Sequence, residues 1–406
     1  MRRLFPLALV LLAALPVRPQ VAAETGLDAG RLKSIPIRLR ELVDNQTIPG
    51  AVALVARHGE IASLDAVGWR DIEGAKPMTT DSIFQIMSMT KPFTGVAAMM
   101  LVEEGKLELH RPIADYLPEF QGQVVEERLP NGNLTTHPPL HPPMVWQLMC
   151  HSSGLGENPD GELSDQLRTM RVPLDEAVRF YATRHLQFEP GTRWRYSNMG
   201  LATLGRIVEK VSGEDYVHFV ESRILKPLGM TDTFFVAPVE KRDRIALVYK
   251  HVNGKLVRAG DDILAGDPTK FRAGARYPGP EYALYSTAGD LVKFYQMLLN
   301  GGVYQGRRYL SRQAIDTMTR VFTPPVEPSG WMGGSGYGLT LEIVDKPEGT
   351  LMLHTPGTFG HGGAFGTEGW IDPHNDLIRI LLTQVSDGSS GPARDAVMQV
   401  GEAAVR

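Results

Sequence analysis

The stretch Ile86-Met87-Ser88-Met89-Thr90-Lys91-Pro92-Phe93-Thr94-Gly95 carries the pattern S-x-x-K at its centre. The apolar run that follows, residues 96–102, is typical of a helix. Residues three apart lie on one face of a helical turn, so the Lys91 amine can approach the Ser88 hydroxyl. A serine hydroxyl becomes a useful nucleophile when a nearby base takes its proton, and a partly buried lysine with a lowered pKa is such a base. The same four letters also fit a helix N-cap followed by a solvated lysine.

A second motif, Tyr196-Ser197-Asn198, follows a turn at Pro190-Gly191 and precedes residues 201–209, whose pattern is helical. A tyrosine and an asparagine two apart on a loop can point the same way. A phenol near a lysine ammonium is biased toward phenolate, so Tyr196 is a candidate base and then acid. The alternative is a packed tyrosine and an asparagine that caps the helix.

A third motif, His361-Gly362-Gly363, lies within residues 359–366 and leads into an alternating strand pattern at 369–372. Glycine allows a ligand to approach the backbone closely, so this segment is a candidate wall of a binding site. The alternative is a glycine-rich turn that contains an incidental histidine.

In this order, the three motifs resemble the serine β-lactamase and penicillin-recognising superfamily. The Tyr-x-Asn element is that of the class C-like branch, which includes family VIII carboxylesterases, class C β-lactamases, D-alanyl-D-alanine carboxypeptidases and D-aminopeptidases. Residues 148–155, 225–230 and 284–291 look like further landmarks of the family. One departure concerns the third motif, because class C β-lactamases have Lys-Thr-Gly where this chain has His361-Gly362-Gly363.

The resemblance implies an α/β domain plus a helical domain, with the active site in the cleft between them. It implies acyl transfer through a serine ester, in which Ser88 attacks a carbonyl while Lys91 and Tyr196 share the proton transfers. Which of the two is the first base stays open. Water then releases the acyl group, and no metal or organic cofactor takes part. The other implied site residues bind substrate. Asn198 also orients Lys91, whereas His361, Gly362 and Gly363 line the cleft. Ala364 joins Ser88 in offering backbone N–H groups to an oxyanion.

The histidine in the third motif bears on the substrate, which would be a small-molecule ester or amide. A lysine there would offer a permanent positive charge to a carboxylate, whereas His361 is charged only when protonated. We therefore expect a carboxylesterase. The alternatives are a β-lactamase or D-alanyl-D-alanine carboxypeptidase or D-aminopeptidase, and a non-catalytic penicillin-binding-like protein.

The order of the expected elements predicts a mixed α/β (α+β) fold, with one antiparallel sheet flanked by helices and built from both ends of the chain. Residues 24–92 and 280–406 would form this α/β domain, and residues 93–279 a mainly helical insertion. We expect helices at 28–45 and 392–405, strands at 51–56 and 60–69 joined by a His58-Gly59 turn, and three short strands within 351–385.

The first residues read as a signal peptide, because Arg2 and Arg3 precede a short apolar run and a small-residue site that ends at residue 23. We therefore expect an exported protein, periplasmic or secreted, without a membrane span after cleavage. The chain has 406 residues and a net charge of −4, which gives no indication of nucleic-acid binding. Cys150 is the only cysteine, so no intrachain disulfide can form, and we expect its side chain to be buried.

Two other features of the sequence are candidate sites. His137 and His141 have metal-like spacing but lie in the proline-rich segment 136–143, which should be an extended loop, and the zinc geometry of a helix is therefore missing. His151 does not complete such a site in the sequence. The glycine-rich residues 333–338 lack the lysine of a phosphate-binding loop and are expected to form a flexible lip near the cleft.

Overall fold

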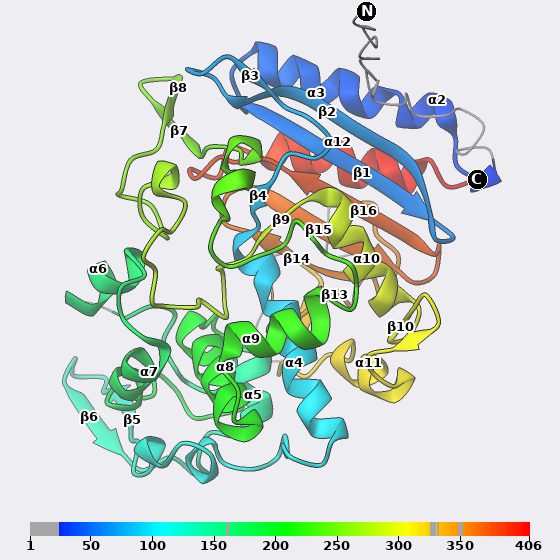
Figure 1. Cartoon of the computed structure of the whole chain (residues 1–406). Helices are drawn as coiled ribbons and strands as arrows, with labels where there is room; N and C mark the ends of the chain where they lie inside the picture. Colours follow the sequence, from blue (N-terminus) through cyan, green and yellow to red (C-terminus); the bar gives the residue numbers. More distant parts are fainter. Residues whose placement is uncertain (1–23, 160–161, 325–329, 331–332, 348–351) are drawn as a thin grey trace, which may run out of the picture.

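The computed structural model describes residues 24–159, 162–324, 330, 333–347 and 352–406 (Figure 1). The signal peptide predicted at residues 1–23 lies outside this described part. An eight-stranded sheet organises the fold, in the order β12-β13-β14-β15-β16-β1-β2-β3. Its strands are β1 (Gly50–Arg57), β2 (Glu60–Asp71), β3 (Lys76–Pro77), β12 (Ser335–Tyr337), β13 (Glu342–Val344), β14 (Phe359–Gly363), β15 (Thr367–Asp372) and β16 (Leu377–Leu382).

All strand pairs in this sheet are antiparallel, and β1 pairs with both β2 and β16. The N-terminal and C-terminal segments are therefore joined in the middle of the sheet. The His58-Gly59 turn closes the β1–β2 hairpin with both residues at positive φ, 54° and 79°. The predicted antiparallel sheet built from both ends of the chain is confirmed.

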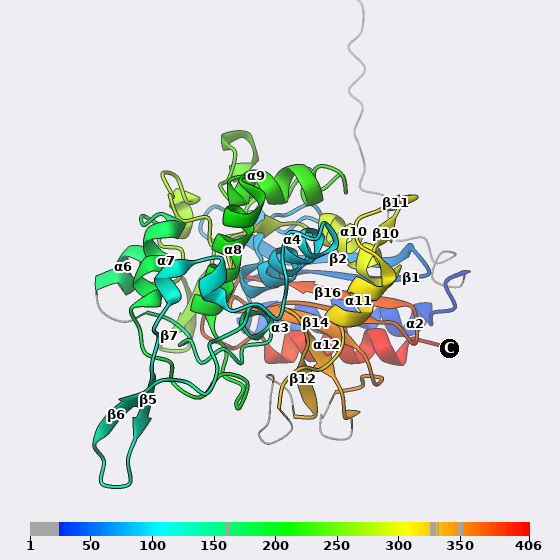
Figure 2. The same cartoon turned by 90° about the horizontal axis from the view of Figure 1, so that it is seen from below.

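β1 is buried on both faces, which explains its unbroken apolar sequence. One face of the sheet carries α3 (Ser34–Asp44) and α12 (Gly391–Ala403), and Ala53 belongs to a core cluster there with Leu39 and Val397. The other face carries α4 (Lys91–Glu103) and α10 (Ala288–Leu299), where Leu54 and Phe294 belong to the larger cluster. Figures 1 and 2 show the two helical layers on opposite sides of the sheet. The helix predicted at 28–45 is divided at Lys33 into α2 (Ala29–Leu32) and α3.

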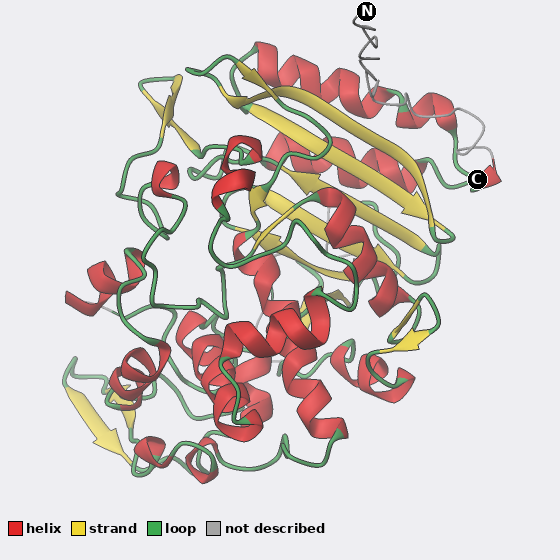
Figure 3. Cartoon of the chain, in the orientation of Figure 1, coloured by secondary structure: helices red, strands yellow, loops and turns green. Residues whose placement is uncertain are grey.

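Between β3 and α10, most of the regular secondary structure is helical, and long loops join the helices (Figure 3). A two-stranded sheet of β4 (Phe84–Gln85) and β9 (Tyr285–Ser286) brings the start and the end of this segment together. The predicted domain boundaries at 93 and 279 stay a prediction. The helices here and in the later chain are α5 (Val145–Met149), α6 (Glu162–Arg168), α7 (Leu174–Ala182), α8 (Asn198–Ser212), α9 (Tyr216–Val220) and α11 (Arg312–Met318), with short turns η1 (Met87–Thr90), η2 (Ile113–Asp115), η3 (Pro118–Phe120), η4 (Glu221–Leu225), η5 (Val239–Arg244) and η6 (Pro268–Lys270).

Several short strands were not predicted. The hairpin of β5 (Val125–Arg128) and β6 (Leu134–His137) turns at Asn131-Gly132, and that of β7 (Tyr249–Val252) and β8 (Lys255–Arg258) turns at Asn253-Gly254. Asn-Gly is a strong hairpin signal, so both could have been found from the sequence. A third short hairpin pairs β10 (Val303–Tyr304) with β11 (Arg307–Arg308). Two segments predicted as loops contain strand residues: the loop at 136–143 begins within β6, and the lip at 333–338 contains β12.

No helix in the part of the chain that the structure describes has the length and apolar character needed to cross a membrane. Cys150 is fully buried, and burial raises the pKa of its thiol to about 12. The expectation of a buried cysteine is confirmed, and a thiol with this pKa is a poor nucleophile at neutral pH.

Candidate active site

Ser88 lies in the single turn η1, which leads directly into α4. The preceding residue, Met87, has a φ of 49°, a left-handed conformation that is unfavourable for a residue with a side chain. β14 passes close to this turn because Gly363 has no side chain, and a Cβ there would lie 2.4 Å from the Ile86 carbonyl oxygen. Gly363 therefore lets the end of β14 reach the turn that carries Ser88.

The Lys91 amine lies beside the Ser88 hydroxyl, as the three-residue spacing predicts. Lys91 is fully buried, and its Nζ is 2.9 Å from each of three oxygen atoms: Ser88 Oγ, Asn198 Oδ1 and the backbone carbonyl oxygen of Glu281. Amide and backbone carbonyl oxygens can only accept hydrogen bonds. A neutral Lys91 therefore donates its two N–H groups to Asn198 and Glu281, and its lone pair faces the Ser88 hydroxyl.

The burial of Lys91 also sets its charge. Burial lowers the pKa of Lys91 from its ordinary value of 10.5 to about 7, although the carboxylates of Glu281 and Glu157 partly oppose this shift. At this pKa, a large fraction of the Lys91 amine is unprotonated near neutral pH. Its geometry and its pKa both suit a base that takes the Ser88 proton.

Tyr196 lies over the same amine, with Lys91 Nζ 4.6 Å from the centroid of its ring. Burial raises the pKa of the Tyr196 phenol above its ordinary value of 10.0, and a hydrogen bond with Ser88 opposes only part of this shift. The expectation that Lys91 biases Tyr196 toward phenolate is therefore wrong. Desolvation penalises the phenolate, and this penalty is the largest influence on the Tyr196 pKa.

His361 is held by two hydrogen bonds that fix its tautomer. Its Nδ1 is 2.6 Å from the Gly362 carbonyl oxygen, and its Nε2 is 2.5 Å from the Tyr337 hydroxyl. Because a carbonyl oxygen cannot donate, Nδ1 carries the proton and Nε2 accepts from Tyr337. Burial and the nearby Lys91 lower the pKa of His361 to about 3, so the imidazole is neutral at physiological pH.

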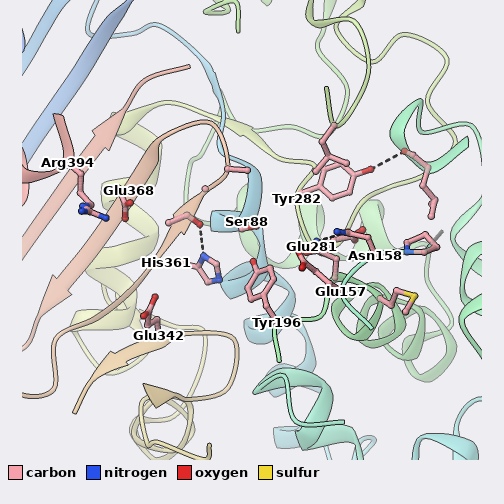
Figure 4. A pocket seen from close by; sticks show the side chains of 18 of the residues that line it. Ser88, Glu157, Asn158, Tyr196, Glu281, Tyr282, Glu342, His361, Glu368 and Arg394 are labelled. Carbon is pink, nitrogen blue, oxygen red and sulfur yellow. Dashed lines mark hydrogen bonds between the residues drawn. The ribbon is translucent and has the colours of Figure 1, made fainter. Parts of the chain in front are cut away.

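These side chains meet at a cavity of about 590 Å³ (Figure 4). Lys91 does not line it, because the amine is buried behind Ser88 and Asn198. Ala364 follows β14 directly and is exposed to the cavity. The predicted site residues in the cavity wall are Ser88, Tyr196, Asn198, His361, Gly362, Gly363 and Ala364.

Sequence reasoning missed the residues that support this site. His151 is buried with its ring centroid 4.4 Å from that of Tyr196, and its Nδ1 accepts a hydrogen bond from the Ser197 backbone N–H at 3.0 Å. Asn158 accepts a 2.9 Å hydrogen bond from Asn198 Nδ2, which orients the amide oxygen toward Lys91. The sequence could have indicated His151, because it lies in the family landmark at residues 148–155. No sequence signal indicated Asn158.

The histidines that were weighed as metal ligands do not come together. His151 is buried behind Tyr196, whereas His137 ends β6 and His141 lies in the exposed segment that follows it. Across the described ranges, no group of three or more histidine, cysteine, aspartate or glutamate side chains is arranged to hold a metal ion.

A family model described as Beta-lactamase matches residues 38–402. The chain belongs to the beta-lactamase family. It is 33% identical over 378 residues to Protein Rv1367c of Mycobacterium tuberculosis, covering 88% of this chain and 91% of that protein. It is 31% identical over 401 residues to the esterase EstB of Burkholderia gladioli, covering 91% and 95% of the two chains.

Among solved structures, the hydrolase EstCE1 superimposes with a TM-score of 0.77 at 22% identity, covering 95% of this chain and all of that one. At this identity the likeness shows the fold alone. The family match and the esterase relative confirm that the chain is a serine hydrolase related to the β-lactamases.

Proposed function

We propose that this serine hydrolase is an exported carboxylesterase that forms an acyl-enzyme on Ser88. The observation that carries the proposal is the environment of the Lys91 amine. Two of its three partners can only accept hydrogen bonds, so the third, the Ser88 hydroxyl, faces the lone pair of the neutral amine. A pKa of about 7 for Lys91 makes that neutral form abundant at neutral pH.

In the acylation step, Lys91 takes the proton from Ser88 as the serine oxygen bonds to the ester carbonyl carbon. The bond to the alcohol oxygen then breaks, and the alcohol leaves with a proton. Tyr196 is protonated and hydrogen-bonded to Ser88, so it is placed to give that proton and regain one from Lys91. Water repeats the sequence on the acyl-enzyme and releases the acid.

The negative charge on the carbonyl oxygen would be stabilised by the backbone N–H groups of Ser88 and Ala364. Ser88 is the second residue of η1, the turn before α4, and Ala364 follows the strand that Gly363 allows close to that turn. Backbone N–H groups held in place in this way stabilise an oxyanion without reorganisation during the reaction.

Neutral esters suit the cavity better than anionic β-lactams. His361 occupies the third motif in its neutral form, with its Nε2 already engaged by Tyr337. It therefore offers no fixed positive charge to a substrate carboxylate, unlike a lysine at the same place. We also propose that the protein is exported, because the basic and then apolar residues at the start of the sequence have the pattern of a signal peptide.

A substrate panel tests the proposal. Purified wild type and Ser88→Ala would be assayed with p-nitrophenyl acetate and butyrate, a chromogenic cephalosporin and a D-Ala-D-Ala peptide. We expect hydrolysis of the esters by the wild type alone, with kcat/KM for the esters well above that for the other two. A higher kcat/KM for the cephalosporin or the peptide would favour the β-lactamase or peptidase alternative. Turnover of no substrate and no labelling by a fluorophosphonate would favour the non-catalytic alternative.

A further inference from the structure

Glu281 places a carboxylate in the wall of the active-site cavity that the proposed ester chemistry does not use. Its side chain is only 3% exposed, and its Oε1 accepts a 2.7 Å hydrogen bond from the Tyr277 hydroxyl. Its other oxygen, Oε2, is buried and has no hydrogen-bond partner among the described residues. A buried carboxylate oxygen without a donor is costly, so a donor from the cavity side would stabilise it.

The neighbouring cations do not fill this role. Lys91 contacts Glu281 only through the backbone carbonyl oxygen, and it forms no ion pair with the carboxylate. Arg394 lies beside Glu368, away from Glu281 across the cavity (Figure 4). Neither cation donates a hydrogen bond to the carboxylate, although the charge of Lys91 acts on it, and Oε2 is therefore open to a donor on a ligand.

Two aromatic side chains near this carboxylate also line the cavity. Tyr181 and Tyr282 both line the cavity, and the Tyr282 hydroxyl is already used in a 3.2 Å hydrogen bond to the Leu167 carbonyl oxygen. Figure 4 shows Tyr282 and Glu281 in the same part of the wall. Aromatic faces attract cations, and a buried carboxylate adds a charge-assisted hydrogen bond.

We propose that Glu281, Tyr181 and Tyr282 form a subsite for an ammonium group on the substrate. The proposal rests on acyl transfer at Ser88 and names the substrate class for that reaction: esters or amides that carry an amine a few bonds from the scissile carbonyl. The ammonium N–H donates to Oε2 of Glu281, which satisfies the orphaned oxygen, and its charge lies beside the two rings.

The preference for an ammonium group depends on pH. Burial raises the pKa of Glu281 to about 7, so its charged form grows as the pH rises from 6 to 8, where a primary alkylamine stays protonated. The titratable groups near Glu281 on the surrounding elements are Lys91 of α4, Tyr181 of α7, Tyr216 of α9, Tyr196 just before α8, Tyr277 and Tyr282 close to it in the chain, and Glu157 on the rim of the cavity.

Matched ester pairs test the subsite on the intact chain. p-Nitrophenyl 3-aminopropanoate and 6-aminohexanoate would be compared with butanoate and heptanoate, in which a methyl group replaces the ammonium. 3-Aminopropyl butyrate would be compared with butyl butyrate, so that both halves of the ester are sampled. In at least one pair, we expect a kcat/KM ratio of amine to methyl of about 10 or more at pH 8, the size of one charge-assisted hydrogen bond.

Glu281→Gln should lower that ratio to near 1, because the amide keeps the shape of the side chain and loses its charge. Any effect of the substitution on Lys91 changes both members of a pair equally and cancels in the ratio. Glu157→Gln, which removes a carboxylate from the exposed rim, should change the ratio less than twofold. A ratio near 1 in every wild-type pair, or an unchanged ratio in Glu281→Gln, overturns the subsite. If the enzyme still hydrolyses the esters in those cases, only the subsite is overturned and the proposed esterase activity stands.

A second measurement needs no variant and so covers the case in which Glu281→Gln does not fold. Butylammonium and 1-pentanol would be compared as inhibitors of p-nitrophenyl acetate hydrolysis by the wild type. We expect butylammonium to inhibit at lower concentration, and its advantage to grow from pH 6 to pH 8. Equal inhibition at all pH values contradicts the subsite.

Discussion

The charge of Lys91 controls the rate in this account, and the pH dependence of kcat/KM for a neutral ester is its most sensitive readout. With a pKa of about 7, the neutral fraction of Lys91 rises from about 0.1 at pH 6 to about 0.9 at pH 8, so kcat/KM should rise about tenfold over that interval. Tyr196 and His361 do not titrate in this range, because their pKa values are displaced above and below it. Glu281 does titrate there, so the apparent pKa belongs to the Lys91–Glu281 pair.

Glu281→Gln separates the two groups. The Glu281 carboxylate raises the pKa of Lys91, so its loss should lower that pKa and move the acidic limb of the profile to lower pH. Glu157→Gln is the control, since Glu157 acts on Lys91 in the same direction but is exposed and is the weaker cause. The assay is p-nitrophenyl acetate hydrolysis from pH 5 to pH 9 at constant ionic strength. A flat profile, or a limb that moves to higher pH in Glu281→Gln, would refute the reasoning.

The remaining predictions concern the other groups of the site. Lys91→Arg keeps a cation that cannot lose its proton, so kcat should fall about 10²–10⁴-fold while the melting temperature reports whether the fold is kept. Tyr196→Phe should lower kcat by a similar factor. Because the two residues act together, the Lys91→Ala, Tyr196→Phe double variant should lose much less kcat than the product of the two single losses. Multiplicative losses would mean that they act independently. His361→Lys should raise the kcat/KM ratio of a carboxylate-bearing β-lactam to a neutral ester several-fold at pH 6, by about 1 kcal/mol, because the native imidazole is neutral there and an amine buried like that of Lys91 is protonated. An unchanged ratio would show that position 361 does not sense substrate charge.

The sequence predicted the parts of this molecule that depend on local spacing. The separation of Ser88 and Lys91 was enough to predict their contact, because one helical turn fixes which side chains are neighbours. The His58-Gly59 turn predicted the first hairpin for the same reason. The Asn131-Gly132 and Asn253-Gly254 hairpins carried an equally clear signal and were missed.

Protonation states were not predictable in this way. A lysine and a tyrosine side by side suggested a phenolate, but the burial of Tyr196 and Lys91 reverses that inference, and burial depends on segments distant in the sequence. The neutral state of His361 depends on its burial and on Lys91, its Nε2 is engaged by Tyr337, and the third partner of Lys91 comes from Glu281. These contacts form only when the chain on both sides of β4 and β9 is folded together.

Acyl transfer by this protein requires a covalent intermediate on Ser88, which mass spectrometry of the labelled protein would detect. The wild type would be treated with a fluorophosphonate, and separately quenched in acid during turnover of p-nitrophenyl acetate, before digestion and peptide mapping. We expect one adduct, on the peptide that contains Ser88, and neither adduct nor turnover in a Ser88→Ala variant whose melting temperature is unchanged. An adduct on Ser152, Ser153 or Ser335 instead, or turnover that survives in folded Ser88→Ala, would contradict it.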